Sequence, residues 1–421
     1  MKKQKDPTSL KSNIIWNSAG SLFYQACIWL MSWVVLRLSG PADNGIFAVA
    51  MAQSNMFFTV AIYGMRAYQS SDLTGKYTDR VYVFSRFFTS GAALLACGGA
   101  VLLWGYGPGT AWPVLFYMAF RISEALMDVL HGIDQRVMRM DIVGKSFLMR
   151  GVVSLAVFAL GLFCGLGLSL SILGMAAASF ILVAIYDVPR ARALGDFSRP
   201  FSFSSMGRLL LECLPLVAYA FLNTAISNLP RVYLETAHGE AAAGIFSAIS
   251  APALLVQMGA AYLFTPLITG FAAAYQQRDK VGFQKLLGRT CLAVGGVGVL
   301  GVLGGFLLGE WGLRFLYGGN PDTLAGVMKN QALLVPVIVS AVVTAFVLFF
   351  NMLLTIIRDF KGLVAANAAG LLCCVLLCGP LIGRGYLQGT NLVVLLSLLV
   401  QLGGLLLSGG LKVKKRFAEK T

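Results

Sequence analysis

Residues Trp112–Arg136 read WPVLFYMAFRISEALMDVLHGIDQR, and this stretch carries the most informative pattern in the chain. Five of its polar residues are spaced by three or four positions, so they share one face of an α-helix. They are Arg121, Glu124, Asp128, His131 and Gln135. The opposite face consists of Leu, Met, Phe, Ala and Val. In a soluble protein this would be an amphipathic surface helix, but the remainder of the chain indicates a lipid environment.

The composition is that of a membrane protein. Of the 421 residues, 57% are hydrophobic and 12% are charged, and the mean hydropathy is +0.77, whereas soluble domains are about a quarter charged. Apolar runs recur from end to end, and about 20 such residues cross the hydrocarbon layer as a helix. The sequence therefore predicts an all-α polytopic membrane protein with twelve transmembrane helices. The expected spans are 13–37, 42–65, 81–105, 112–132, 146–167, 169–188, 208–230, 241–270, 288–309, 331–357, 362–383 and 389–411.

The basic residues are distributed unevenly between the two sides of this arrangement. Most of the 33 Lys and Arg residues fall at the termini and in alternate connections, a set to which we assign Arg86 and Arg150. The remainder are Arg37, Arg121, Arg231, Arg314, Lys329 and Arg384. Because cytoplasmic loops carry the excess of Lys and Arg, both termini are expected to be cytoplasmic. The net charge of +15 then indicates contact with anionic membrane lipids, not with nucleic acid.

The sequence contains an internal repeat. Gly45-Ile46-Phe47-Ala48 is echoed by Gly244-Ile245-Phe246-Ser247, and Asp79-Arg80-Val81 is echoed by Asp279-Lys280-Val281. Each half holds six predicted spans, so both halves enter the membrane in the same direction, as in a parallel repeat of two six-helix bundles around a central cleft. We therefore expect an N-lobe at 1–200 with the first six spans and a C-lobe at 201–421 with the last six.

No group of residues predicts catalysis or a cofactor. The eight Cys residues lie in apolar runs without a CxxC pair, which indicates buried thiols. His131 and His238 lie in different halves and make no metal site. Gly144-Lys145-Ser146 matches the end of a phosphate-binding loop, but Arg139 stands where the first glycine belongs. The chain is therefore expected to be no enzyme and to bind no metal or cofactor.

Ionisable residues inside the spans are the candidate functional groups, because they are costly in lipid and usually face a cavity or one another. Arg121 lies about 13 Å from the outer end of its span, where it could meet an anionic substrate. Glu124, Asp128 and His131 could then carry protons or cations. The alternative is a self-neutralising face, in which Arg121 pairs with Glu124 and Asp128 pairs with His131.

Further polar residues could line a binding site. Amide side chains can donate and accept hydrogen bonds with sugar hydroxyls, although each could equally join two helices. Arginines near span ends could contact a head group or act as membrane anchors. The amides are Asn17, Gln53, Asn228 and Asn351, and the arginines are Arg37, Arg66 and Arg231.

Several segments resemble Wzx-type polysaccharide flippases of the multidrug/oligosaccharidyl-lipid/polysaccharide exporter superfamily. They are Arg37–Phe47, Gly64–Asp72, Glu124–Gly132 with Gln135-Arg136, Asn228–Tyr233 and Leu354–Arg358. The resemblance implies that an undecaprenyl-pyrophosphate-linked oligosaccharide is moved by alternating access from the cytoplasmic to the outer leaflet of a bacterial cytoplasmic membrane. It implies that Arg121, with Arg37, Arg66 and Arg231, contacts the head group. It also implies a polysaccharide polymerase and glycosyltransferases as partners.

Two other functions remain open. One is a cation-coupled multidrug or metabolite exporter of the same fold, whose site should be lined by aromatic residues and one acid. The other is a non-transporting membrane scaffold of a polysaccharide assembly complex, in which the Arg121 face only holds helices together. Some relatives in the flippase family hold several arginines in the cavity, whereas the predicted spans leave only Arg121 deep in the membrane.

Overall fold

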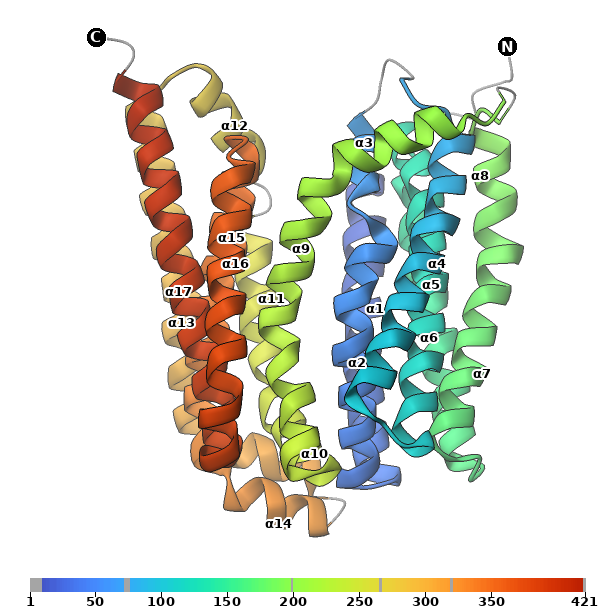
Figure 1. Ribbon diagram of the computed structural model, residues 1–421, viewed down its shortest axis with the longest axis vertical. Coiled ribbons are helices and arrows are strands. Elements are labelled where there is room, and N and C mark those ends of the chain that lie inside the picture. The colour runs from blue at the N-terminus through green and yellow to red at the C-terminus, as the bar shows by residue number, and fades with distance from the viewer. Residues whose placement is uncertain (1–9, 72–75, 198–199, 265–266, 319–320, 419–421) are drawn as a thin grey trace. The chain divides into compact units, whose positions relative to one another are not determined.

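The computed structural model describes residues 10–71, 76–197, 200–264, 267–318 and 321–418, and these ranges contain helices and turns but no strand (Figure 1). The chain forms two compact units. We call them the N-terminal unit (Met1–Ser39 and Ile46–Val217) and the C-terminal unit (Gly40–Gly45 and Ala218–Thr421). The lobe boundary near residue 200 stays a prediction.

Long apolar helices make up most of the N-terminal unit. They are α1 (Leu10–Leu38), α2 (Pro41–Ile62), α4 (Asp79–Trp104), α5 (Pro108–Arg136), α6 (Met140–Phe163) and α7 (Gly167–Leu182). Shorter segments adjoin them: α3 (Met65–Ser71), the π-helical η1 (Val183–Asp187) and α8 (Val188–Leu194). Local sequence sets the ends of α4, since the Thr78 side chain accepts a hydrogen bond from the Val81 N–H and Gly105 adopts a left-handed φ of 67°.

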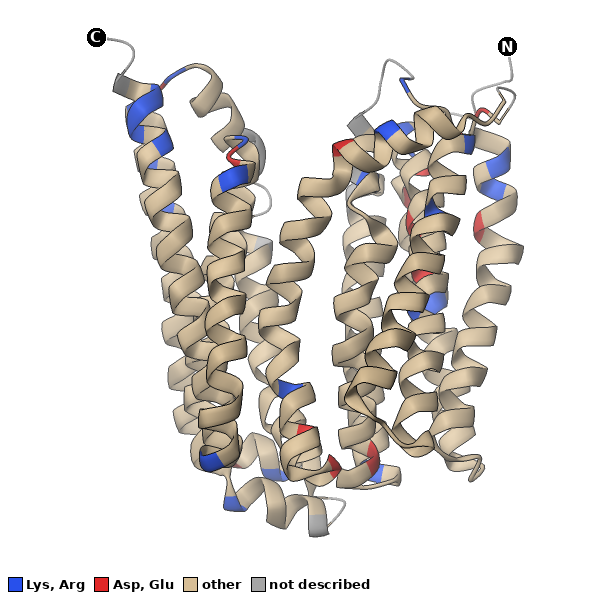
Figure 2. Ribbon diagram, in the orientation of Figure 1, with Lys and Arg blue, Asp and Glu red and all other residues tan. Residues whose placement is uncertain are grey.

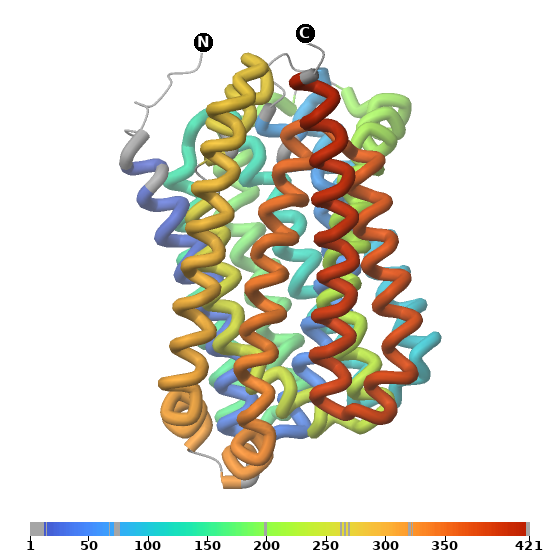
Figure 3. The backbone as a smooth tube through the Cα atoms, turned by 90° about the vertical axis from the view of Figure 1, so that its left-hand side faces the viewer, coloured from blue at the N-terminus to red at the C-terminus, as the bar shows by residue number. Residues whose placement is uncertain are grey.

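The C-terminal unit also consists mainly of long helices. Helix α9 (Phe203–His238) begins in the N-terminal unit and ends in the C-terminal unit. Its other helices are α10 (Glu240–Ser250), α11 (Ala253–Phe264), α12 (Ile268–Gln276), α13 (Lys280–Tyr317), α14 (Pro321–Lys329), α15 (Leu334–Ile356), α16 (Phe360–Leu377) and α17 (Gly383–Ala418), with η3 (Gln331–Leu333) and η4 (Cys378–Ile382) between them. Helix α17 packs beside α15 and α16 (Figure 3).

Within the described residues, each predicted span lies mainly on helices, and residues 265–266 of the predicted span 241–270 lie outside the described residues. Within the described residues, nine helical stretches are long and apolar enough to cross a membrane, and one of these, Phe360–Phe417, contains both α16 and α17. The predicted span 241–270 is broken: α10 and α11 meet at an angle of 48°, beside Pro252, because proline cannot donate the backbone hydrogen bond. Helix α5 is not among the nine stretches, since charged residues interrupt its apolar sequence.

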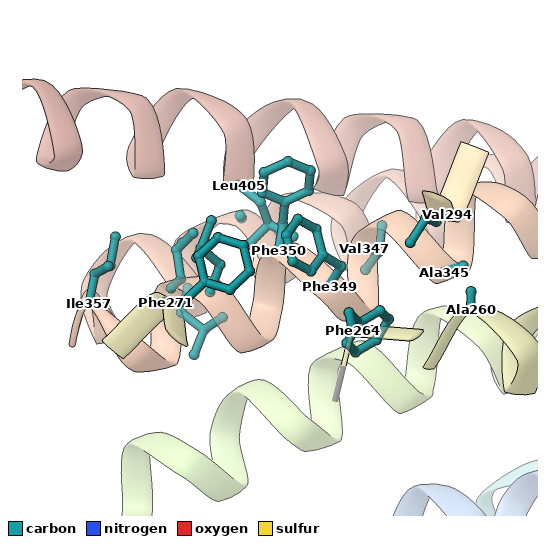
Figure 4. Close-up of a cluster of buried hydrophobic side chains, with 14 of the residues drawn as sticks. Ala260, Phe264, Phe271, Val294, Ala345, Val347, Phe349, Phe350, Ile357 and Leu405 are labelled. Carbon is teal, nitrogen blue, oxygen red and sulfur yellow. The ribbon is translucent and has the colours of Figure 1, made fainter. Parts of the chain in front are cut away.

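The two units differ in what their helices bury. The C-terminal unit has an apolar core in which Phe271 packs on Phe349 with ring centroids 5.7 Å apart, and Phe349 packs on Phe350 at 5.1 Å (Figure 4). In the N-terminal unit, charged residues occur part of the way along the helices, whereas the long helices of the C-terminal unit carry charge mainly near their ends (Figure 2). The candidate functional groups therefore concentrate in the N-terminal unit.

Helices α1 and α6 pack together more extensively than any other pair in the N-terminal unit. Glycines permit this approach: a Cβ atom on Gly144 would overlap the backbone carbonyl of Trp16, and one on Gly20 would overlap the carbonyl of Gly144. Small residues are the usual means by which transmembrane helices come so close. Gly144, which the sequence associates only with a chance phosphate-loop match, is therefore a packing residue that holds α6 against α1.

Candidate functional site

A first polar group lies at the middle of α5, a helix that packs against α3, α4, α6, α7 and α8. The Arg121 guanidinium donates a hydrogen bond to Glu124 Oε2 at 2.5 Å and lies 3.7 Å from the ring centroid of Phe58 on α2. Tyr24 on α1 donates its hydroxyl to the same Glu124 oxygen at 3.1 Å. The pairing of Arg121 with Glu124 therefore exists, but it is joined to a second helix.

Arg150 on α6 lies behind this pair and is fully buried. Its Nη2 donates to Ser123 Oγ at 2.7 Å and to the Phe120 carbonyl at 3.1 Å, and its Nε donates to Tyr24 Oη at 3.3 Å. Within the part of the chain that the structure describes, no carboxylate forms an ion pair with Arg150. This buried guanidinium is therefore held by neutral groups and keeps an uncompensated positive charge.

A second polar group surrounds Asp128, about 10 Å farther along α5. Asp128 Oδ2 accepts a hydrogen bond from Arg86 Nη2 at 2.9 Å, and its Oδ1 accepts one from Arg66 Nη1 at 3.2 Å. Arg66, on α3, also donates its Nε to Gln135 Oε1 at 3.0 Å. The alternative pairing of Asp128 with His131 is wrong, because two guanidinium groups occupy both Asp128 oxygens and His131 pairs with Asp187 instead.

The structure places two further arginines inside the N-terminal unit. The distribution of charge assigns Arg86 and Arg150 to cytoplasmic connections, yet both lie within long apolar helices and both side chains are 0% exposed. Arg86 lies about 10 Å along α4 from its first residue, and Arg150 lies about 15 Å along α6. Both residues lie within three turns of a helix end that carries other basic residues. A count of Lys and Arg for each connection therefore assigns them to the loop. Only the packing of α4 and α6 around α5 shows that they point inward.

These groups form two layers. The accessible layer consists of Arg66, Asp128, Arg121 and Glu124, whose side chains are 27%, 20%, 15% and 14% exposed. The buried layer consists of Arg86 and Arg150. Together the layers hold four guanidinium groups and two carboxylates, which leaves two positive charges in excess. Guanidinium groups match phosphate oxygens in bidentate geometry, so the chemistry of this site suits an anionic ligand.

The structure does not bring the other predicted residues of this unit into the two layers. Arg37 is exposed at the end of α1, with its guanidinium 5.2 Å from the Trp33 ring centroid. Asn17 is half-buried on α1, and Gln53 is buried on α2, where it donates to the Cys97 carbonyl at 3.5 Å. Their roles in binding stay predictions.

In the C-terminal unit, Asn351 belongs to a closed network of amides that joins four helices. Its Nδ2 donates to Asn223 Oδ1 at 3.1 Å, and its Oδ1 accepts from Asn367 Nδ2 at 3.0 Å. Gln401 Nε2 closes the network by donating to Asn367 Oδ1 at 2.6 Å and Asn223 Oδ1 at 2.9 Å. These hydrogen bonds join α9, α15, α16 and α17, and Gln401 Oε1 is the atom of the network without a partner among the described residues.

Two other residues predicted to bind substrate lie on α9 in this unit. Among the described residues, Asn228 donates within its own helix, to the Thr224 carbonyl at 2.8 Å. Arg231 lies 6.0 Å from the Phe246 ring centroid and is partly buried. Their contact with a substrate stays a prediction.

The substitution Asn367→Leu is expected to destabilise the C-terminal unit by about 1–2 kcal/mol, because it removes the hydrogen bonds that join Asn367 to Asn351 and to Gln401, which then keep only their bonds to Asn223. Thermal unfolding of the purified protein in detergent measures the change. Asn228→Leu is the matched control and should have a smaller effect, because Asn228 bonds only within α9. Equal effects of the two substitutions would contradict a joining role for the network.

Comparison with known proteins completes this description. No family model matches the chain. It is 21% identical over 294 residues to the capsular polysaccharide biosynthesis protein CapF of Staphylococcus aureus, a match that covers 69% of this chain and 73% of that protein. The structure of the lipid II flippase MurJ in an inward closed conformation is similar to this chain with a TM-score of 0.74 at 12% sequence identity. The match covers 96% of this chain and 90% of the MurJ chain.

A multidrug resistance transporter of the MATE family, in the MOP superfamily, is similar in its inward-facing conformation with a TM-score of 0.63 at 13% sequence identity. The match covers 97% of this chain and 99% of the transporter chain. The chain therefore has the fold of these transporters and is a multi-pass integral membrane protein. The predicted all-α polytopic architecture and the resemblance in fold to a flippase and to a transporter of this superfamily are confirmed.

Proposed function

We propose that this protein is a flippase that moves a lipid-linked oligosaccharide with an anionic, pyrophosphate-type head group across a bacterial cytoplasmic membrane. The observation that carries the proposal is the excess of guanidinium groups over carboxylates in the two layers around α5. Ionisable groups in the membrane are costly and are kept for function. A dianionic head group would balance the two charges in excess.

Binding would proceed by exchange of partners. Arg66 and Arg121 are partly accessible and already hold carboxylates, so they can turn from Asp128 and Glu124 to phosphate oxygens. The carboxylates that they leave can then take up protons or cations, which is the coupling role proposed for Glu124 and Asp128, with His131 beside them. Arg37 and Arg231, with the amides Asn17, Gln53, Asn228 and Asn351, remain proposed contacts for head group and sugars.

The sequence similarity to a capsular polysaccharide biosynthesis protein supports a place in cell-surface polysaccharide assembly. The proposed partners are accordingly the lipid-linked substrate, anionic membrane lipids, a polysaccharide polymerase and glycosyltransferases. The direct test is the sidedness of lipid-linked oligosaccharide after depletion of the protein in its host. Accumulation in the cytoplasmic leaflet with loss of surface polymer is expected. Normal sidedness with normal polymer would favour the multidrug exporter.

The substitution Arg121→Ala is expected to reduce flipping by at least about tenfold, since a charge-assisted hydrogen bond contributes about 1.5–3 kcal/mol. The measurement is the rate at which lipid-linked oligosaccharide appears in the outer leaflet. Arg384→Ala, at an exposed position with no proposed role in binding, is the matched control for removal of one arginine. A scaffold would instead tolerate the double change Arg121→Gln with Glu124→Gln, because the two charges are lost together, so normal polymer in that variant contradicts a binding role.

A further inference from the structure

A third polar group lies near the Arg136 end of α5. His131 Nε2 is 3.3 Å from Asp187 Oδ1, and Asp187 belongs to the π-helical segment η1, which packs against α5. Asp134 is three residues after His131 and therefore lies on the same face of α5. The three side chains are at most 1% exposed. One imidazole and two carboxylates are thus enclosed between α5 and η1, and π-helical turns are frequent at functional sites.

The hydrogen-bonding capacity of this group is largely unused. Within the described residues, neither carboxylate oxygen of Asp134 has a hydrogen-bond partner, and Asp187 Oδ2 and His131 Nδ1 also have none. Buried polar atoms are nearly always paired, and an unpaired one is a reason to look for a function. The group therefore has room for at least one more proton.

The neighbouring cations are already held by other groups. The titratable groups that act on the three residues are Arg66 on α3, Asp128 on α5, Tyr186 in η1, Arg139 before α6 and Asp141 in α6. Arg190 on α8 lies 3.5 Å from the Tyr186 ring centroid and donates to the Tyr186 carbonyl at 2.8 Å. Arg139 donates to Asp141 at 2.8 Å, a hydrogen bond that raises the pKa of Arg139, and Arg66 donates to Asp128. Asp134 and Asp187 thus share no guanidinium of their own.

We propose that His131, Asp134 and Asp187 form a buried proton-binding site. Two ionised carboxylates enclosed without a cation would cost several kcal/mol each, and a bound proton removes one of these charges. The proton would sit on Asp134, because neither of its oxygens has a hydrogen-bond partner among the described residues. A metal ion is a poorer occupant, because no cluster of His, Cys, Asp or Glu among the described residues has the geometry to hold one.

The site is electrostatically connected to the accessible layer, because the Arg66 charge acts on both Asp134 and His131. An anion bound at Arg66 adds negative charge nearby and therefore favours the protonated site, and by reciprocity a protonated site favours anion binding. This linkage rests on the proposed function, whereas proton binding itself does not. It extends the proposed coupling groups from Glu124, Asp128 and His131 to Asp134 and Asp187.

Infrared difference spectroscopy of the purified protein during a pH titration tests the site, because a protonated carboxylic acid has a carbonyl band that a carboxylate lacks. We expect this band in the wild type near neutral pH and its loss in Asp134→Asn. Glu310→Gln, which removes an exposed carboxylate paired with Arg314, is the control and should keep the band. Absence of the band from the wild type, or its persistence in Asp134→Asn, overturns the proposal.

The linkage is tested by repeating the titration with inorganic pyrophosphate, whose binding is measured separately by calorimetry. The titration midpoint of the band is expected to move to higher pH in the wild type. Binding of pyrophosphate without such a shift overturns the linkage and leaves the proton site. Failure of pyrophosphate to bind contradicts the proposed anionic substrate, and the band in the absence of ligand still decides the proton site.

Discussion

Replacement of Arg150 by Met is expected to abolish flipping while leaving the protein as stable as the wild type or more stable. Arg150 is fully buried, and a neutral side chain of similar length in place of a buried charge often stabilises a protein by about 1–4 kcal/mol. Its partners keep other hydrogen bonds, since Ser123 Oγ also donates to the Phe120 carbonyl and Tyr24 donates to Glu124. The loss of function follows because one of the two charges in excess disappears.

Thermal unfolding in detergent and the sidedness of lipid-linked oligosaccharide are the two measurements. Arg86→Met is the matched control, because Arg86 is equally buried but is paired with Asp128. It should lower the free energy of unfolding by about 2 kcal/mol, less than for a fully buried pair, since Asp128 is partly exposed and keeps Arg66. Equal destabilisation by both substitutions, or normal flipping with Arg150→Met, would show that Arg150 is a structural residue.

The substitution Gly144→Ala is expected to destabilise the N-terminal unit by about 3 kcal/mol or more, which is large for one methyl group. The added Cβ would overlap the backbone carbonyl of Trp16, and a backbone atom cannot rotate away as a side chain does. Helix α1 must therefore move away from α6, and this weakens the most extensive helix–helix contact of the N-terminal unit. The measurement is the yield of folded protein in the membrane, together with its thermal unfolding in detergent.

Gly99→Ala is the control for this experiment. Gly99 lies within α4, and a Cβ atom there meets nothing within 4 Å, so the substitution should be neutral or stabilise the helix by up to about 1 kcal/mol. If Gly144→Ala behaves like Gly99→Ala, the two helices do not need their close approach.

The sequence pattern predicts this fold well because the dominant signal is local. Apolar runs of span length determine the helices, and the spacing of Arg121, Glu124 and Asp128 predicts a polar face on α5 that the structure contains. The pairing within the face was predicted only in part. Glu124 lies one turn from Arg121 and pairs with it, whereas Asp128 pairs with arginines from α3 and α4, which no spacing along α5 can reveal.

The same limit applies to the residues that the sequence did not indicate. The burial of Arg86 and Arg150 depends on which side of α4 and α6 faces α5, a property of tertiary packing. Asp187 reaches His131 from a segment more than fifty positions later in the chain. Asp134 is different, because its spacing of three from His131 places it on the predicted face. That spacing was a sufficient signal, and it marks the residue on which the proton-binding proposal depends.

The charged face of α5 also has a consequence for how the protein is made. A helix that carries Arg121, Glu124, Asp128 and Asp134 inserts poorly into hydrocarbon when it is alone. During synthesis, Arg86 on α4 is available before α5 emerges, but Arg150 on α6 and Asp187 after α7 are translated only later. Helix α5 must therefore remain beside the insertion machinery until its later neighbours arrive. We therefore expect the first half of this protein to enter the bilayer as a group of helices, not one helix at a time.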